Sequence, residues 1–578
     1  MNEQTSAATV VRIAAEVGVT GTQVTAVAKL LKEGNTVPFI ARYRKEAHGN
    51  LDEVQILKIQ ERVGYYTELE ERRAVILKSI DEQGKLTDDL REKIEKCMVK
   101  SALEDLYQPY KPKRRTRAMI AKEKGLEPLA DIIWAQGCEE PEAAATAFVD
   151  AAKGVEDAAA ALAGARDICA ERIADIADVR GLVRRTYATK AVVKSSVSLV
   201  KPPTEPTKFE QYYDFEEPIA EMPSHRYLAI RRGQTEGVLF MRLVVDPAPV
   251  LERIEEYAGV KADSPLADEL RSAASDAYKR LISPACELDV TMEKKQESDR
   301  AAVEIFAENL RNLLLASPLG EKKVLAIDPG IRTGCKVAML DATGKFIGNT
   351  VIYPMQKPDE SREAIAKIIV KYRPEAIAIG NGTAGRETEA FVRTTLKTMG
   401  EKNIIVVSVS ESGASVYSAS EIAREEFPSL DLTVRGAISI GRRLQDPLAE
   451  LVKIDPKAIG VGQYQHDVFQ PLLSAKLDDV TVSCVNKVGV ELNTASAPLL
   501  TRVSGIGASL AKRIVVMNIP REELNMAAQD AKHHLGRISA TLPFSPALAE
   551  QYMEGNLVLP LKDKRYTQAL KEISERLV

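Results

Sequence analysis

The apolar positions near the start of the chain recur at the spacing of an α-helix. They follow this spacing from Val10 to about Ala102, with a break at Thr20–Thr22. The segments on either side of the break, Val10–Val17 and Gln23–Leu31, each place their apolar residues on one face. Two short helices around a glycine-containing turn predict a helix-turn-helix shape. This shape leaves two alternatives, a DNA-reading element or a plain pair of packed helices.

The helical pattern continues through the middle of the chain. Alanine-rich helices are expected to about Lys194, because alanine has the highest helix propensity. Prolines interrupt the segment Lys201–Pro223, and further helices follow it. A long helix is expected from about Glu293 to Leu315, ending at Pro318–Gly320.

At Lys322 the pattern changes from helical spacing to short apolar runs separated by turns. The expected strands are Val324–Ile327, Gly334–Asp341, Phe346–Tyr353, Ala376–Ile379 and Ile404–Val409, and the expected helices are Ser361–Lys371 and Glu387–Leu396. Three consecutive strands followed by alternating helix and strand predict a mixed sheet covered by helices. The order β-β-β-α-β-α-β is that of an RNase H-like domain.

A glycine pair near residue 505 predicts a helix-hairpin-helix. The run Ala497–Val503 leads into Ser504–Ala508, and a helix Ser509–Val516 follows with Lys512 and Arg513. Backbone amides around Gly505 and Gly507 can bind a phosphate without reading bases, and the two cations add charge. The alternative is an ordinary turn between packed helices.

These elements predict a mainly α, multidomain protein with a central α/β RNase H-like domain on a mixed sheet and a C-terminal helix-hairpin-helix module. The expected divisions are residues 1–200 (helical, with helix-turn-helix elements), 201–320 (helical, with a long connecting helix), 321–455 (RNase H-like), 456–520 (helix-hairpin-helix) and 521–578 (helical tail). In the tail the expected helices are Glu522–Leu542, Pro546–Glu554 and Thr567–Leu577, with no series of strands that could close a barrel.

The composition of the chain limits the kinds of ligand and site that it can have. The net charge is −4, so phosphate contacts must come from local clusters of lysine and arginine. The six cysteines form no C-x-x-C pair, which offers neither a zinc site nor a disulfide framework. There is no signal segment and no apolar run near the ~18 residues of a membrane span. We therefore expect a cytoplasmic protein with no membrane partner.

One basic cluster lies in the loop Tyr107–Arg117. Prolines 109 and 112 prevent a continuous helix, so the charges are expected on an extended loop. The loop is either a solvated connector or a phosphate-contacting arm with Tyr107 and Tyr110 available for base stacking. The cations of this candidate arm are Lys111, Lys113, Arg114, Arg115 and Arg117.

Three carboxylates are candidates for a metal-dependent site. Asp328 ends the first strand of the α/β region, Glu411 follows the strand Ile404–Val409, and Asp446 precedes Pro447. Converging carboxylates could bind Mg²⁺ for phosphodiester cleavage. Asp446 fits equally well as a helix N-cap, and Asp328–Gly330 as a turn. The loop Gly380–Arg386 could cradle a phosphate, but it has neither P-loop nor dinucleotide-fold spacing.

Several long stretches resemble the Tex family of bacterial transcription-accessory proteins, over about residues 5–516. They are Gly34–Glu46, Leu106–Arg115, Pro223–Arg226, Ala326–Gly330, Ser412–Ser420, Arg443–Glu450 and Gly460–Asp467. The resemblance implies helix-turn-helix elements, a YqgF-type RNase H-like domain and helix-hairpin-helix modules. In related resolvases the acids matching Asp328, Glu411 and Asp446 would be the catalytic and metal-binding set. The family's OB-fold RNA-binding domain is not recognisable after Val516, so we expect this chain to lack it.

Three functional hypotheses follow. The first is a non-catalytic factor that binds the backbone of RNA or DNA with little sequence preference and needs no cofactor. The second is an Mg²⁺-dependent nuclease or junction resolvase that uses the three carboxylates. The third is a protein-interaction scaffold for RNA polymerase or the ribosome.

Overall fold

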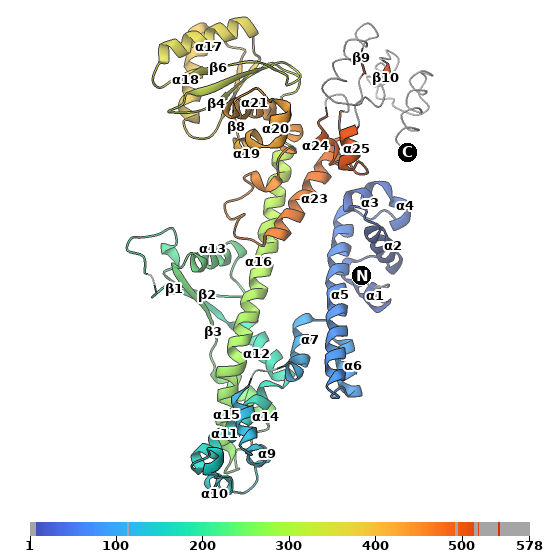
Figure 1. Ribbon diagram of the computed structural model, residues 1–578, viewed down its shortest axis with the longest axis vertical. Helices are drawn as coiled ribbons and strands as arrows, with labels where there is room; N and C mark the ends of the chain where they lie inside the picture. The colour runs from blue at the N-terminus through green and yellow to red at the C-terminus, as the bar shows by residue number, and fades with distance from the viewer. Residues whose placement is uncertain are drawn as a thin grey trace. The chain divides into compact units, whose positions relative to one another are not determined.

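The computed structural model describes residues 7–112, 115–200, 202–491, 495–513, 518–519 and 542–543. These residues form two compact units, which are described separately. The first unit contains residues 7–29 and 54–302 together with 467–469, and the second contains residues 30–53 and the remaining described residues after 302. Figure 1 shows the elements of both units along the chain.

The first unit is mostly helical, as the apolar spacing predicts. Its helices are α1 (Ala7–Val17), α2 (Gly21–Lys32, which runs past the unit boundary), α5 (Glu53–Glu82), α6 (Asp88–Lys96), α7 (Lys100–Tyr107), α8 (Arg117–Glu123), α9 (Glu127–Ala135), α10 (Pro141–Thr146), α11 (Ala158–Ala174), α12 (Ala177–Lys190), α13 (Ser224–Thr235), α14 (Ala248–Ala258), α15 (Ala267–Asp276) and the first part of α16 (Ser283–Leu314). Small side chains on α11, such as Ala161 and Ala165, are fully buried. They let α8, α9 and α15 pack closely around α11.

The same unit contains a three-stranded antiparallel sheet where the sequence predicts only helices and an irregular segment. Strands β1 (Val192–Val197), β2 (Asp214–Pro218) and β3 (Leu239–Val244) pair in the order β2-β1-β3. The expected helix ending near Lys194 was therefore wrong at its end, because α12 stops at Lys190 and Lys194 lies in β1. The burial of β3 (LFMRLV) alternates, but the exposed Phe240 hides this alternation in the sequence.

The second unit holds the remaining elements. Its helices are α3 (Val37–Tyr43), α4 (Lys45–His48), the end of α16, α17 (Pro358–Tyr372), α18 (Gly385–Met399), α19 (Ala414–Ala419), α20 (Glu421–Glu426), α21 (Leu432–Gln445), α22 (Pro447–Leu451), α23 (Gln470–Val488), α24 (Ala497–Leu500) and α25 (Ala508–Arg513). Its main strands are β4 (Val324–Asp328), β5 (Cys335–Leu340), β6 (Phe346–Ile352), β7 (Ala376–Gly380) and β8 (Ile405–Val409). These bounds confirm the predicted order of strands and helices.

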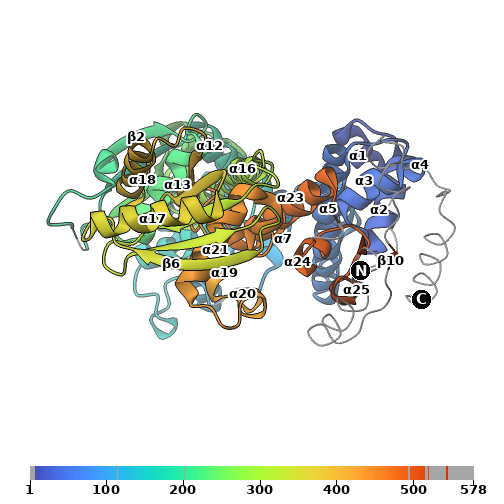
Figure 2. The ribbon, with the colours of Figure 1, turned by 90° about the horizontal axis from the view of Figure 1, so that it is seen from above.

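The five strands form one mixed sheet in the order β6-β5-β4-β7-β8. β4 pairs antiparallel with β5 and parallel with β7, and β8 extends the parallel part. One face carries Leu325, Ile327 and Val337 and packs on α17 and α18. The other face carries small residues such as Ala326 and packs on α21. Figure 1 shows the sheet between α17 and α21, and Figure 2 shows the same domain from above, with α17 beside β6. The mainly α architecture with a central mixed-sheet RNase H-like domain is confirmed.

Only two short strands are described beyond α25. They are β9 (Asn518–Ile519) and β10 (Leu542–Pro543), which pair in parallel. Leu542, predicted as the last residue of a tail helix, lies in β10. The rest of that helix and the other two expected tail helices lie outside the described residues. Within the described part of the chain, no helix combines the length and apolar character needed to cross a membrane.

Candidate functional site

The carboxyl edge of the RNase H-like sheet brings together two of the three predicted carboxylates. β4, β7 and β8 run parallel, so Asp328, the loop after Gly380 and the loop carrying Glu411 meet at one edge. The N–H of Gly382 donates to Oε1 of Glu411 at 3.0 Å, and the N–H of Glu411 donates to Asn381 Oδ1 at 3.2 Å. Glu411 therefore joins the two loops through hydrogen bonds.

The glycine-rich loop after β7 packs against the Glu411 carboxylate. A side chain at Gly380 or Gly382 would collide with the Glu411 carboxylate, so these positions need glycine for close approach. Because the amide of Gly382 binds Glu411, it does not face an incoming phosphate. The loop supports the carboxylate, and the prediction of a phosphate cradle at Gly380–Arg386 gains no support from its geometry.

The Asp328 carboxyl lies in an environment that disfavours its ionised form. Burial and the nearby charge of Glu411 raise the pKa of Asp328 to about 6, and Lys336 opposes this shift. Lys336 stands opposite Asp328 in the β4–β5 ladder, yet its Nζ donates to the carbonyls of Thr333 at 2.7 Å and Gly334 at 3.0 Å. The lysine therefore braces the loop after β4, and its charge only partly compensates the carboxyl.

The structure does not bring Asp446 to this edge. A Cβ built on Gly436 of α21 would lie 3.0 Å from Oδ2 of Asp328, whereas Asp446 follows the last residue of the same helix. Ten residues of helix separate the two positions by about 15 Å. The Asp446 carboxylate caps α22 by accepting from the N–H of Ala449 at 2.9 Å. Its alternative interpretation as an N-cap is confirmed, and its expected place beside Asp328 was wrong.

The donors at the edge do not fit a two-metal site. Such a site needs several carboxylate oxygens converging on the ions. The helix position that faces Asp328 is Gly436, which offers no oxygen, and one oxygen of Glu411 is bound to Gly382. Asp431 stands at the same end of α21, but it caps that helix through Thr433 N at 2.9 Å. No group of three metal-binding side chains occurs among residues the structure describes.

A positioning residue that the motif analysis did not single out is Arg443. It lies within the Arg443–Glu450 stretch and is buried. Its Nη1 donates to the carbonyls of Ser410 at 2.9 Å and Ser412 at 2.6 Å. These two carbonyls flank Glu411, so Arg443 fixes the loop that carries the carboxylate. This residue of the Arg443–Glu450 stretch thus stabilises the loop at the carboxyl edge of the sheet.

The predicted basic arm is partly committed to ion pairs within the chain. Lys111 Nζ lies 2.8 Å from Glu104 Oε2, and Arg72 together with Lys111 lowers the pKa of Glu104 to about 2. Arg115 pairs with Glu123 at 2.6 Å. Arg117 is exposed at the start of α8 and forms no ion pair with a described residue. Lys113 and Arg114 lie outside the described residues.

The two tyrosines beside this arm differ in accessibility. Tyr107 is buried, and its hydroxyl hydrogen-bonds to Ser79 Oγ at 2.9 Å, so its predicted role in base stacking was wrong. Tyr110 is half-buried at the end of a short 3-10 helix, η1 (Gln108–Tyr110). Only Tyr110 keeps a ring face near the arm.

Hydrogen bonds to α23 hold the glycine hairpin at residues 504–507. Asn486 of α23 is buried and holds the turn from below, accepting from Ser504 N at 3.0 Å and donating to Arg502 O at 2.9 Å. Gly505 has a φ of +90°, which favours glycine. A Cβ at Gly505 or Gly507 would meet nothing within 4 Å.

The amides of this hairpin are available. Among the described residues, no hydrogen bond uses the N–H of Gly505 or Gly507, whereas Ile506 N donates to Val503 O at 3.0 Å. Lys512 and Arg513 lie in α25, but their side chains are outside the described part. The hairpin therefore presents two unbonded N–H groups with open space around them.

Family comparisons agree with this arrangement. Four family models match: the Tex-like protein N-terminal domain over residues 7–81, the Tex central region-like model over 137–306, the Tex protein YqgF-like domain over 322–445 and the helix-hairpin-helix motif over 485–518. They cover both compact units, the carboxyl edge and the hairpin.

Individual relatives extend the match along the chain. Protein YhgF of Escherichia coli (strain K12) is 50% identical over 87% of this chain and 66% of its own length. Transcriptional accessory protein Tex of Neisseria gonorrhoeae is 48% identical over 86% of this chain and 66% of its own length. YdcI of Bacillus subtilis (strain 168) is 46% identical over 89% of this chain and 72% of its own length. The chain thus spans slightly less than two thirds of the first of these relatives, and by its sequence and its domains it belongs to the Tex family.

Proposed function

We propose that this protein is a nucleic-acid-binding accessory factor of transcription that grips the sugar-phosphate backbone without reading sequence. The observation that carries the proposal is the pair of unbonded amides at Gly505 and Gly507, held open by Asn486. Backbone amides bind phosphate oxygens equally well in RNA and DNA of any sequence. The name of the gonococcal relative, transcriptional accessory protein Tex, supports the proposed role in transcription.

Replacing Gly507 with glutamate tests the hairpin. The substitution fits the open space without steric conflict, but it places a carboxylate where the phosphate would bind. Loss of a charge-assisted hydrogen bond plus added repulsion is expected to weaken binding to single-stranded RNA about tenfold or more. The measurement is fluorescence anisotropy at low salt.

Gly137→Glu is the matched control, because a side chain at Gly137 also meets nothing within 4 Å and the position lies outside the hairpin. Its affinity is expected to match that of the natural chain. Equal affinity for the Gly507→Glu protein would exclude the hairpin as the binding site.

The basic arm is proposed to add phosphate contacts, mainly through Arg117. Each cation that contacts a phosphate of a single strand contributes about 0.7 to the slope of log K against log salt. Arg117→Gln is therefore expected to lower that slope by about this amount. Lys111→Gln is expected to lower it less, because Glu104 already compensates this charge. If the Lys111 variant loses more slope than the Arg117 variant, the assignment of Arg117 is wrong.

RNA polymerase is the proposed partner complex, with the ribosome as its alternative. The test is affinity purification of the tagged full chain with nuclease treatment on the column. Retention of polymerase after digestion supports a protein-mediated association, and its loss means that the nucleic acid alone bridges the two. A metal-dependent nuclease is not proposed, since the donors at the carboxyl edge do not fit the metal site that such a reaction needs.

A further inference from the structure

Strand β6 forms one edge of the RNase H-like sheet, and no strand among the described residues pairs with its outer side. It pairs only with β5. No described residue makes a hydrogen bond to the free side of Phe346–Ile352. At the opposite edge, by contrast, Arg393 Nη2 donates to the carbonyl of Val406 in β8 at 3.0 Å.

The β6 sequence lacks two of the usual protections of an exposed edge, although a register shift interrupts its pairing with β5 between Phe346 and Gly348. Natural edge strands avoid further pairing through charged residues or prolines within the strand. The seven residues Phe346–Ile352 (FIGNTVI) contain neither. Alternate residues of an edge strand point their main-chain groups outward, so β6 offers unpaired donors and acceptors to an incoming chain.

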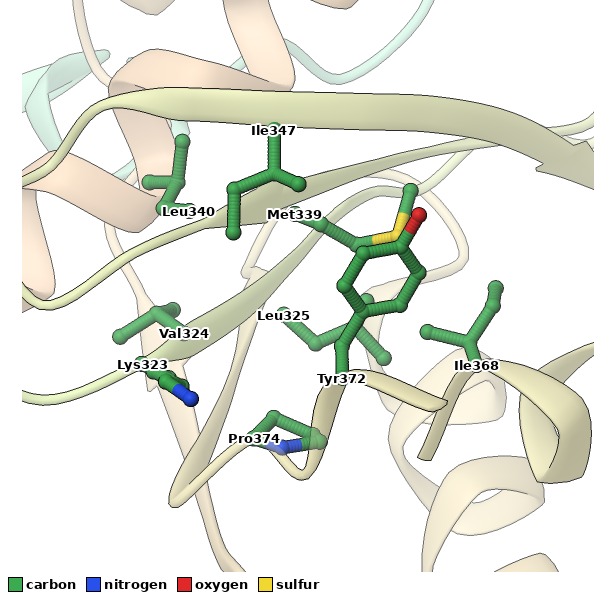
Figure 3. Close-up of a pocket in the computed structure, with 9 residues that line it drawn as sticks. All are labelled: Lys323, Val324, Leu325, Met339, Leu340, Ile347, Ile368, Tyr372 and Pro374. Carbon is green, nitrogen blue, oxygen red and sulfur yellow. The ribbon is translucent and has the colours of Figure 1, made fainter. Parts of the chain in front are cut away.

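Part of the strand packs on the rest of the domain, although Ile347 remains 44% exposed. On the α17 side Ile347 points toward Met339 and Tyr372 across a narrow apolar recess (Figure 3). Gly348 lies close to Met339, because a Cβ there would sit 3.5 Å from its Cε. An anchored edge can bind an extended segment without first ordering itself.

Apolar side chains continue the edge on the α21 side. Val351 and Tyr353 are 39% and 38% exposed, and both border Gly334, where a side chain would collide with them. Ile331 is 49% exposed, and its carbonyl accepts a hydrogen bond from Gln356 next to Met355, which is 46% exposed. Exposed apolar side chains gathered near an edge strand favour a binding surface.

Two cations bracket the strand. Lys345 directly precedes β6, and Arg332 lies in the loop beside Ile331. Both are exposed; the charge of Lys345 helps to lower the pKa of nearby Asp341, and Arg332 forms no ion pair within the described part of the chain. An occupant with acidic residues would compensate both charges.

We propose that β6 is a docking edge for an extended, acidic segment of a partner protein, which adds to the sheet as a sixth strand. Only a polypeptide can complete the row of main-chain hydrogen bonds, and its alternate side chains would cover Val351 and Tyr353. The seven residues of β6 set the length of the segment at about seven residues. The proposal does not depend on the nucleic-acid function of the hairpin.

The test uses the full chain and three fluorescein-labelled nine-residue peptides. The first alternates glutamate with valine, the second replaces its glutamates with lysines, and the third carries a central proline in the glutamate peptide. The glutamate peptide is expected to bind. The lysine peptide is expected to bind at least about tenfold more weakly because it lacks charge complementarity. The proline peptide is expected to bind at least about tenfold more weakly because it lacks a main-chain donor. Hydrogen exchange is expected to show new protection at residues 346–352.

Two variants locate the site, and a third is the control. Val351→Glu and Tyr353→Ser are each expected to weaken binding of the glutamate peptide about tenfold. Ile405→Glu alters an apolar position of the other edge strand that is 47% exposed, and it should leave the affinity unchanged. Unaltered exchange elsewhere in the sheet establishes that the variants are folded.

Several outcomes would overturn the proposal. The proposal is wrong if no peptide binds, if the lysine peptide binds more tightly than the glutamate peptide, or if β8 is protected in place of β6. It is also wrong if the Val351→Glu and Tyr353→Ser proteins both keep full affinity. Protection of residues 346–355 by a single-stranded RNA but by no peptide would mean that the patch binds nucleic acid.

Discussion

Replacement of Asp105 by alanine is expected to lower the free energy of unfolding of the first unit by about 3–5 kcal/mol. Asp105 is 4% exposed and stands between two buried arginines of α12. Its Oδ1 accepts from Arg184 Nη2 at 2.7 Å and from Arg180 Nε at 3.2 Å, and its Oδ2 accepts from Arg184 Nη1. Without the carboxylate, two positive charges would remain out of water with little compensation.

The remaining partner cannot replace Asp105. Asp289 of α16 reaches Arg184 Nη2 at 3.2 Å but lies partly in solvent, where charge interactions are weaker. Because Asp105 belongs to α7 and the arginines to α12, the loss is expected to separate these helices first. Hydrogen exchange of the full chain should therefore show the largest loss of protection in residues 177–190.

Asp89→Ala is the control for the general effect of losing an ion pair. Asp89 pairs with Lys93 at 2.7 Å on the surface of α6, where both side chains are mostly exposed. Its loss is expected to change stability by no more than about 0.5 kcal/mol. If the two variants lose similar amounts of free energy of unfolding, the buried cluster stabilises the fold no more than a surface ion pair does.

The RNase H-like domain could be predicted from the sequence because its signals are local and strong. The buried strands read as short apolar runs, and a turn separates each from the next element. All five main strands and both flanking helices appeared within a few residues of their expected bounds. The three-stranded sheet of the first unit could not be predicted in the same way. Its strand β2 (DFEEP) carries acidic residues and a proline, which disfavour strands, and its pairing with β1 stabilises it instead.

The site was predictable only as far as strand topology places it. Asp328 and Glu411 follow parallel strands, whose carboxyl ends meet at one edge, so their proximity follows from the strand pattern. Asp446 follows a helix, and sequence alone does not show which end of that helix lies over Asp328. Tyr107 likewise reads as an exposed aromatic beside a basic loop, and tertiary packing buries it.

Replacement of Asp328 by asparagine is expected to stabilise the RNase H-like domain at pH 8 by about 3 kcal/mol. Burial and Glu411 raise the pKa of Asp328 to about 6 from an ordinary value of 3.8. A raised pKa means that folding favours the protonated form. The stabilising effect of protonation is complete below about pH 4, and it is lost as the pH rises through about 6. Asparagine keeps the shape of the side chain without ever ionising, so the variant escapes this loss.

The pH dependence separates this effect from a general change in packing. The difference between Asp328→Asn and the natural chain should be large at pH 8, shrink below pH 6 and vanish near pH 4, measured by hydrogen exchange of peptides covering β4 and α21. Asp341→Asn is the opposite control. Thr343 and backbone amides lower the pKa of Asp341, so neutralising it should destabilise the domain at pH 8. If the difference in the free energy of unfolding between Asp328→Asn and the natural chain is the same at every pH, the pKa of Asp328 is not raised by folding. The expected profile would instead show that ionisation of Asp328, beside Glu411 and away from water, opposes folding of this domain.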